Sequence, residues 1–311
     1  MIDAPLHQNK NRSFTFAFAA VLLSTSLPAY CIAQSIESKI AELKTSEVKS
    51  LEASKVRSTV TTSALTIAGG NKNADGSLSP SQQIQVIQVK GTISRKLLAK
   101  LQQTITSSEV DPIPAGLIVF LDSKGGDGMA AIEIGRMLRR ANAHVFVNGE
   151  CSSACILLLA GGVVRGAPTF SVGIHQARIT LSSDAGVIKK EVDVSENPVA
   201  KALLQKFDQS AKVYFADMEI PLDLFIAMQA HPTKRVYRLS SSEITAYGLN
   251  GIEENYLKQR TLLYAQRPGR WPKDEDELLR RTTKVSTECI PHDADPVEFT
   301  KCYRKVLQDI F

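Results

Sequence analysis

A run of five apolar residues at 117–121 (LIVFL) constrains the fold more than any other feature, because such a run is typical of a strand buried on both faces. Strand-like runs also occur at 84–91 and 144–147. Helical periodicity at 94–105, and again after the loop at 122–128, separates the three runs. Strands and helices that alternate in this way imply right-handed crossovers between parallel strands. We therefore predict an α/β fold with a parallel sheet.

Further elements follow the third strand. A small apolar helix is expected at 154–159, and strands are expected within 170–194. Longer helical patterns occupy 197–218, 221–229 and 240–247. We divide the chain into four parts: a signal peptide at 1–33, a helical and linker extension at 34–83, an α/β domain at 84–257, and a helical C-terminal extension at 258–311.

The N-terminus has the organisation of a signal peptide. A polar, basic segment precedes an apolar run at 14–23, which is too short to span a membrane comfortably. Small residues lead up to Ala33, so we predict cleavage after Ala33 and export to the periplasm. Two alternatives stay open: an uncleaved membrane anchor, and acylation of Cys31, which Tyr30 disfavours because a small residue is expected before that Cys. No later run reaches the length of a spanning helix, so the mature protein is predicted to be soluble.

The segment that follows the signal peptide has two parts. Apolar residues recur at mostly three- to five-residue intervals within 35–57, which predicts an amphipathic helix. This helix could pack on the domain, bind another subunit or stay loose. Residues 58–83 are rich in Ser, Thr, Gly, Asn and Gln and are interpreted as a linker.

Composition narrows the classes of function. The chain of 311 residues is 43% hydrophobic and 22% charged, which excludes a collagen-like or wholly disordered chain. The net charge of +5 comes from scattered Lys and Arg, so a nucleic-acid partner is not indicated. The five Cys are an odd number, but Cys31 would leave with the signal peptide. An even set in an exported protein allows disulfides between the remaining Cys151, Cys155, Cys289 and Cys302.

Two loops and one histidine carry the residue types of a catalytic site. In the loop at 122–128 (DSKGGDG), paired glycines let backbone N–H groups approach a ligand. In the loop at 149–155 (GECSSAC), Ser153 lies at a strand-to-helix turn, where the next N–H group can stabilise an oxyanion. His175, in the segment GIHQ, can act as the general base for a serine. Each feature alone has an ordinary explanation: a tight turn, a helix N-cap or a buried histidine.

Taken together, these residues resemble the proteolytic subunit of the Clp protease. That family has Ser-Pro-Gly-Gly after a strand, where this chain has Ser-Lys-Gly-Gly at 123–126. The family's nucleophile is the fifth residue of a Gly-x-Ala-x-Ser-Met-Gly type turn, and its His stands in Met-Ile-His-Gln; Ser153 and His175 hold these positions here. The family's Leu-Ser-x-x-Glu-Ala-x-x-Tyr-Gly-Leu segment is similar to LSSSEITAYGL at 239–249. The resemblance covers 84–257 and is greatest to exported bacterial Clp-like proteins with a Cys-x-Ser-Ala-Cys turn.

The resemblance implies a Clp protease/crotonase-like spiral of ββα units and a serine peptidase activity. Ser153 would be the nucleophile, His175 the general base, and the N–H groups of Gly126 and Ala154 the oxyanion hole. Ser152 is the competing nucleophile by proximity. Substrates would be peptides or unfolded segments. No cofactor or metal is expected, nor an ATPase partner, because an exported protein has no ATP supply. Clp-like folds commonly assemble into rings, so a homo-oligomer is an option.

One departure from the family leaves the identity of the catalytic acid open. The family has an Asp shortly before its Leu-Ser pair, but 231–238 contains no carboxylate. Glu243 has its own helix-capping explanation. A displaced acid such as Asp223 or Glu191 could orient His175, or a backbone carbonyl could do so in a slower Ser–His dyad. The third option is a catalytically degenerate relative that serves as a binding or assembly module. An acyl-CoA hydratase or isomerase is a weaker alternative, because coenzyme A is not expected outside the cytoplasm.

The cysteines carry a further prediction. Cys151 and Cys155 bracket Ser153, either as a disulfide that rigidifies the turn or as two small buried residues that pack under the sheet. Cys289 and Cys302 are the stronger disulfide candidates, because they lie in a polar C-terminal tail that is expected to be weakly held otherwise.

Overall fold

The computed structural model describes residues 58–67, 82–105, 116–182, 188–232, 235–290 and 295–308. The predicted signal peptide at 1–33 and the predicted amphipathic helix at 35–57 lie outside these residues. None of the helices in the described residues combines the length and the hydropathy needed to cross a bilayer.

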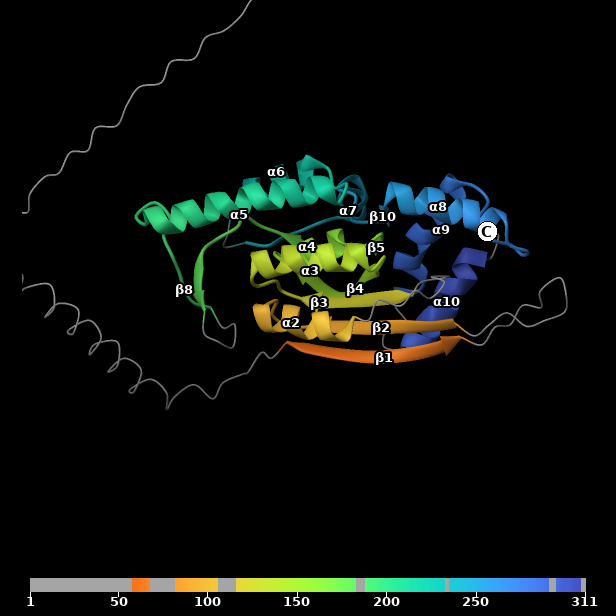
Figure 1. Ribbon diagram of the computed structural model, residues 1–311. Helices are drawn as coiled ribbons and strands as arrows, with labels where there is room; N and C mark the ends of the chain where they lie inside the picture. The colour runs from red at the N-terminus through yellow and green to blue at the C-terminus, as the bar shows by residue number, and fades with distance from the viewer. Residues whose placement is uncertain are drawn as a thin grey trace, which may run out of the picture. The chain divides into compact units, whose positions relative to one another are not determined.

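A mixed sheet forms the centre of the fold (Figure 1). Its strands run in the order β1-β2-β3-β4-β5-β10, and β6 pairs with β4 and with β9. The pairs β2–β3, β3–β4, β4–β5 and β4–β6 are parallel, which confirms the predicted parallel sheet. The strands are β1 (Thr59–Ile67), β2 (Gln82–Lys90), β3 (Leu117–Ser123), β4 (His144–Ser152), β5 (Val164–Gly166), β6 (Val172–Ile174), β9 (Tyr237–Arg238) and β10 (Gly251–Ile252).

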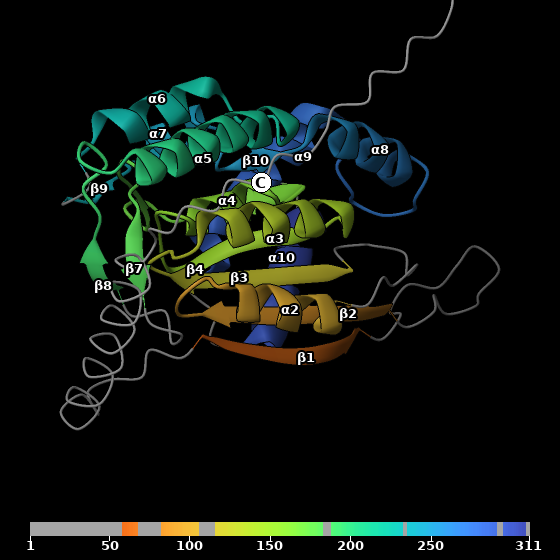
Figure 2. The same ribbon diagram turned by 60° about the vertical axis from the view of Figure 1, so that its left-hand side comes forward.

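Helices cover both faces of this sheet. Successive side chains of β3 alternate between the faces: Val119 and Leu121 join a core cluster with helices α2 to α7, and Phe120 joins a second cluster with α8 to α10. Figure 2 shows α2 and α3 on the near side of the strands and α10 behind them. The helices are α2 (Arg95–Thr104), α3 (Gly128–Arg140), α4 (Cys155–Ala160), α5 (Pro198–Asp217), α6 (Leu222–Ala230), α7 (Ser241–Ala246), α8 (Glu254–Ala265), α9 (Glu275–Glu288) and α10 (Pro296–Gln308).

The interpretation of 58–83 as a linker is wrong for its first part. Thr59–Ile67 forms β1, which pairs antiparallel with β2 in a continuous register from Thr59 opposite Lys90 to Ile67 opposite Gln82. The Ser and Thr content suggested a linker, but β-branched Thr and Val favour strands when a neighbouring strand offers its edge. The sheet therefore begins upstream of the predicted domain boundary at residue 84.

The C-terminal region is also better held than expected. Phe299 and Tyr303 of α10 are buried and pack against the ring of Phe146 in β4. Cys289 and Cys302 form a disulfide with their Cα atoms 5.5 Å apart, which joins the end of α9 to α10. The expectation of a weakly held tail is wrong, because the apolar face of α10 covers the second face of the sheet.

One small hairpin stands apart from the main sheet. Strands β7 (Thr180–Ser182) and β8 (Ile188–Glu191) pair antiparallel between β6 and α5. They match the strands expected within 170–194. The hairpin thus connects the strand that precedes His175 to the long helix α5.

Candidate active site

The loops singled out in the sequence meet at one edge of the sheet. Ser123 at the end of β3 lies opposite Cys151 of β4, and Ser152 of β4 lies opposite Gly173 of β6. Since these strands are parallel, the segments that leave their carboxyl ends share that edge. The glycine loop, the Ser153 turn and His175 are therefore neighbours.

Ser153 occupies a strained turn. It stands between the end of β4 and the start of α4 and has a φ of 57°. Its N–H donates to the carbonyl of Gly173 (2.9 Å), and its own carbonyl accepts from the N–H of Ile156 (3.1 Å). A left-handed conformation is uncommon for a residue other than glycine and clusters at functional sites. A serine in such a strand-to-helix turn is the arrangement that exposes a nucleophile in hydrolases.

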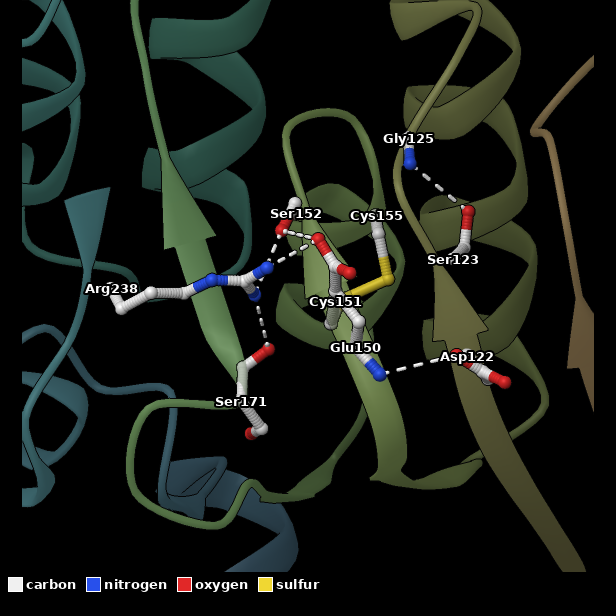
Figure 3. The surroundings of a disulfide bond; sticks show 9 residues. All are labelled: Asp122, Ser123, Gly125, Glu150, Cys151, Ser152, Cys155, Ser171 and Arg238. Carbon is white, nitrogen blue, oxygen red and sulfur yellow. Dashed lines mark hydrogen bonds and ion pairs between the residues drawn. A yellow bond between two sulfur atoms is a disulfide. The ribbon is translucent and has the colours of Figure 1, made fainter. Parts of the chain in front are cut away.

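A disulfide closes this turn. Cys151 and Cys155 are bonded, with their Cα atoms 5.2 Å apart, and both are fully buried. The bond ties the end of β4 to the first residue of α4 (Figure 3). Of the two interpretations of this pair, the structure therefore has the disulfide, and the bond holds both ends of the segment that contains Ser153.

The glycine loop packs directly against the Ser153 turn. Gly125 has a φ of +98°, and a Cβ built on it would lie 2.7 Å from the Cβ of Ser153 and 3.0 Å from the N of Ala154. Gly126 has a φ of +148° and faces Ile93, whose carbonyl oxygen would lie 2.2 Å from an added Cβ. Both positions therefore need glycine, one for contact with the turn and the other for contact with the segment after β2.

Two backbone N–H groups lie at this junction. Among the described residues, neither the N–H of Gly126 nor the N–H of Ala154 donates a hydrogen bond. Ala154 is buried, and a buried backbone N–H group is nearly always paired, so an unpaired one beside a strained serine suggests a binding role. Gly126 is exposed, so its N–H is open to a ligand from solvent. The two N–H groups are those that the resemblance assigns to an oxyanion hole.

His175 follows β6 and is 8% exposed. Its Nδ1 lies 2.7 Å from the carbonyl oxygen of Gln176. Because a carbonyl oxygen only accepts, Nδ1 carries a proton, and in the neutral imidazole the lone pair is then on Nε2. In the described part of the chain no hydrogen bond joins His175 to Ser153, although both residues leave the same edge of the sheet.

None of the candidate acids forms a hydrogen bond with His175 in the described part of the chain. Glu191 forms an ion pair with Arg178 (3.2 Å), and Asp223 is exposed in the first turn of α6. Glu243 forms a capping box with Ser240, whose hydrogen bonds lower the pKa of the Glu243 carboxyl. The carbonyl of Gln176 is the acceptor that faces Nδ1, which fits the alternative of a Ser–His pair oriented by the backbone.

Sequence reasoning missed a charged cluster beside the turn (Figure 3). Arg238 forms an ion pair with Glu150 (2.6 Å), and its guanidinium also donates to the Oγ of Ser152 (3.2 Å). The Ser152 hydroxyl donates in turn to Glu150 (2.8 Å), and Ser152 is 2% exposed. The hydroxyl of Ser152, the competing nucleophile, is therefore buried and bound, whereas no hydrogen bond engages the hydroxyl of Ser153 in the described residues.

The one trace of this cluster in the sequence is Gly173. A Cβ there would lie 2.5 Å from Ser152 Oγ and 2.4 Å from a methyl group of Val236. The glycine thus lets Arg238 reach across β6 to Ser152. No three His, Cys, Asp or Glu side chains come together as metal ligands in the part of the chain that is described.

No protein-family model and no curated protein matches the chain. Among solved structures, it is similar to two mutants of the 1510-N membrane-bound stomatin-specific protease. A Ser-to-Ala mutant has 16% identity and a TM-score of 0.39, over 58% of this chain and 83% of that one. A Lys-to-Ala mutant in complex with a substrate peptide has 21% identity and a TM-score of 0.39, over 55% and 76%.

The chain is also similar to an Asn-to-Asp mutant of ClpP1 from Listeria monocytogenes, with 17% identity and a TM-score of 0.38, over 53% of this chain and 88% of that one. At these scores the similarities assign no role to any residue of this chain. The site described above therefore stands on its own geometry.

Proposed function

We propose that the protein is a serine peptidase in which Ser153 and His175 carry out acyl transfer. The observation that supports this most is the conformation of Ser153, held at a φ of 57° in a disulfide-closed turn. Beside it lie two backbone N–H groups that donate no hydrogen bond within the described part of the chain. Strain of this kind persists only where the surrounding structure maintains it.

The chemistry follows from the atoms at the site. Ser153 Oγ attacks the carbonyl carbon of the peptide and its proton passes to His175 Nε2. The N–H groups of Gly126 and Ala154 stabilise the resulting oxyanion. His175 returns the proton to the leaving amine, and a water molecule activated by the same nitrogen then hydrolyses the acyl-enzyme.

A neutral carbonyl is a weaker orienter than a carboxylate. Removal of the buried Asp from a Ser-His-Asp triad lowers the rate by about 10⁴. The hydrogen bond from His175 Nδ1 to the Gln176 carbonyl selects the productive tautomer but adds no negative charge to stabilise an imidazolium. We therefore expect a slow peptidase with a reactive but not highly activated serine.

The setting of the reaction is proposed from the N-terminal segment and the cysteines. Two disulfides fit an oxidising compartment, and the apolar run at 14–23 fits export to the periplasm with cleavage after Ala33. ATP is not supplied there, so we expect no ATPase partner. Substrates would then be peptides or segments that are already unfolded, and the protein could act as a homo-oligomer through its 84–257 domain.

A fluorophosphonate probe tests the assignment, because it reacts only with an activated serine. We expect labelling of the exported protein, loss of labelling in Ser153→Ala, and retention in the matched control Ser152→Ala. His175→Ala should slow labelling strongly. Labelling that survives Ser153→Ala would overturn the assignment of the nucleophile, and an unchanged rate in His175→Ala would remove the histidine as base.

The second candidate is a catalytically degenerate binding or assembly module. The observation that favours it is the lack of a hydrogen bond between Ser153 and His175 among the described contacts. In unliganded enzymes, catalytic hydrogen bonds are often long or poorly aligned and shorten only when substrate binds, so the peptidase remains our first proposal. A folded wild-type protein that no probe labels would favour the module.

A further inference from the structure

Gln176, the residue whose carbonyl orients His175, is itself anchored at both backbone and side chain. Its N–H donates to the carbonyl of His231 (2.8 Å), which links it to the end of α6. Its side-chain Nε2 donates to Oε1 of Gln229 on α6 (3.3 Å). With these two contacts in place, the carbonyl of Gln176 has little freedom to turn away from His175.

The chain of hydrogen bonds continues from α6 to a carboxylate on α5. Gln229 Nε2 donates to Oδ1 of Asp208 (3.2 Å). The order is therefore Asp208, Gln229, Gln176 and His175, with each residue joined to the next by one hydrogen bond. It links two helices to the segment after β6, although its members are far apart in the sequence.

The carboxylate sets the direction of the whole chain. An ionised carboxylate only accepts, so the amide of Gln229 must turn its NH₂ toward Asp208 and its oxygen toward Gln176. That oxygen in turn requires the NH₂ of Gln176. Without the carboxylate, the amides of Gln229 and Gln176 can flip together and reverse the direction of their hydrogen bond, so the Gln176 side chain is no longer held in one orientation.

We propose that Asp208 and Gln229 are positioning residues that hold His175 in the Nδ1-protonated tautomer by fixing Gln176. The inference rests on the proposed function only for its catalytic consequence. An adjacent acid would orient the His175 imidazole by direct contact. Asp208 instead helps to orient it from a distance, through the amides of Gln229 and Gln176. None of the sequence-based candidates for the acid, Asp223 or Glu191, takes part in this chain.

The environment of Asp208 agrees with this role. The side chain is half-buried on α5, and this burial raises the pKa of its carboxyl, while the Gln229 hydrogen bond and the charge of Lys212 lower it. Burial is the largest of these effects and the pKa is raised overall, while the hydrogen bond that aligns Gln229 favours the ionised form of Asp208. The competing explanation is a clamp between α5 and α6 with no influence on the imidazole.

Histidine tautomers distinguish the two explanations without any reference to activity. Long-range ¹H–¹⁵N NMR of the exported protein with ¹⁵N-labelled His reads the protonation of Nδ1 and Nε2 at His175. We expect the Nδ1-protonated form in the wild type and a mixture of tautomers in Asp208→Asn and Gln229→Leu. Asp208→Glu, which keeps an acceptor-only group, should retain the wild-type tautomer. Asp217→Asn, on the same helix but in a surface ion pair with Arg136, is the matched control.

The rate of probe labelling measures the effect of the same variants on the reactivity of Ser153. We expect the labelling rate to fall roughly fivefold in Asp208→Asn and Gln229→Leu, less than for loss of a direct charge-assisted hydrogen bond, because Asp208 acts through two amide groups. Asp208→Glu and Asp217→Asn should change the rate little. An unchanged tautomer in folded Asp208→Asn and Gln229→Leu would overturn the proposal. A tautomer shift in a protein that no probe labels would uphold the positioning of His175 while the peptidase assignment fails.

Discussion

Gly125 packs so closely against Ser153 that it leaves no room for a side chain of its own: a Cβ on Gly125 would lie 2.7 Å from the Cβ of Ser153. The two residues come from different loops, one after β3 and the other after β4. Their contact ties the proposed oxyanion-hole segment to the proposed nucleophile.

Gly125→Ala should damage the site more than the fold. The added methyl group meets Ser153, the Ser152 carbonyl and Ala154, and the φ of +98° strains any L residue. We expect a loss of about 1–3 kcal/mol in the free energy of unfolding and a fall in probe labelling of more than tenfold. Urea unfolding and labelling rates measure both. In the control Gly251→Ala, the nearest atom to the new Cβ is 3.9 Å away, and both quantities should hardly change.

Arg238 should matter more than an ordinary surface arginine. Arg238→Gln leaves Glu150 and the buried Ser152 without their cationic partner, so we expect the free energy of unfolding to fall by about 1–2 kcal/mol, allowing for the partial exposure of the pair. The control Arg136→Gln breaks an exposed ion pair with Asp217 and should cost less than about 1 kcal/mol. Equal losses in the two variants would mean that the cluster beside β4 is no more than a surface contact.

Much of the core could be predicted from sequence, because the apolar residues whose spacing predicts each helix or strand are also the residues that are buried. The apolar run at 117–121 is β3, and the helix predicted at 94–105 is α2, with Ser94 as its N-cap. The helix predicted at 197–218 corresponds to α5, which Asn197 caps. Each of these elements can be recognised from its own stretch of sequence, without information from distant residues.

Features that depend on contacts between distant segments could not be predicted. The strand β1 is recognisable only beside β2, because Ser and Thr suit both a linker and a strand edge. Arg238 lies in a two-residue strand and reaches Ser152 only because Gly173 stands between them. The Asp208–Gln229 chain joins residues with no shared motif. The boundaries of the four predicted parts of the chain stay predictions.

Removal of the two disulfides should have different effects, one mainly on the stability of the protein and the other on the reactivity of Ser153. The bond between Cys289 and Cys302 spans 13 residues and joins α9 to α10, so the double change to Ala should lower the free energy of unfolding by about 2–3 kcal/mol. Labelling of the folded protein should be unaffected. The double change of Cys151 and Cys155 to Ala should instead slow labelling, since that bond closes the Ser153 turn. Thermal unfolding and labelling of both variants test this, and the reverse pattern would contradict it.

A second buried histidine, His144, lies away from the candidate site and contacts two tyrosines of the C-terminal helices. His144 is 2% exposed and lies between sheet and C-terminal helices, with Nδ1 2.6 Å from the hydroxyl of Tyr303 and Nε2 2.6 Å from that of Tyr256. Burial, and then the charge of Arg260, hold its pKa well below 6.5. The folded protein therefore keeps His144 neutral, while the unfolded chain binds a proton near pH 6.5.

Because the unfolded state binds more protons below that pH, stability should fall as the pH falls, by up to about 1.4 kcal/mol per pH unit from this one group. His144→Gln can still hydrogen-bond both tyrosines but does not titrate, so its stability should depend less steeply on pH. Urea unfolding of both proteins between about pH 7.5 and 5.5 measures the difference, in which the other titrating groups cancel. Parallel curves would show that His144 is protonated as easily in the folded protein as in the unfolded chain.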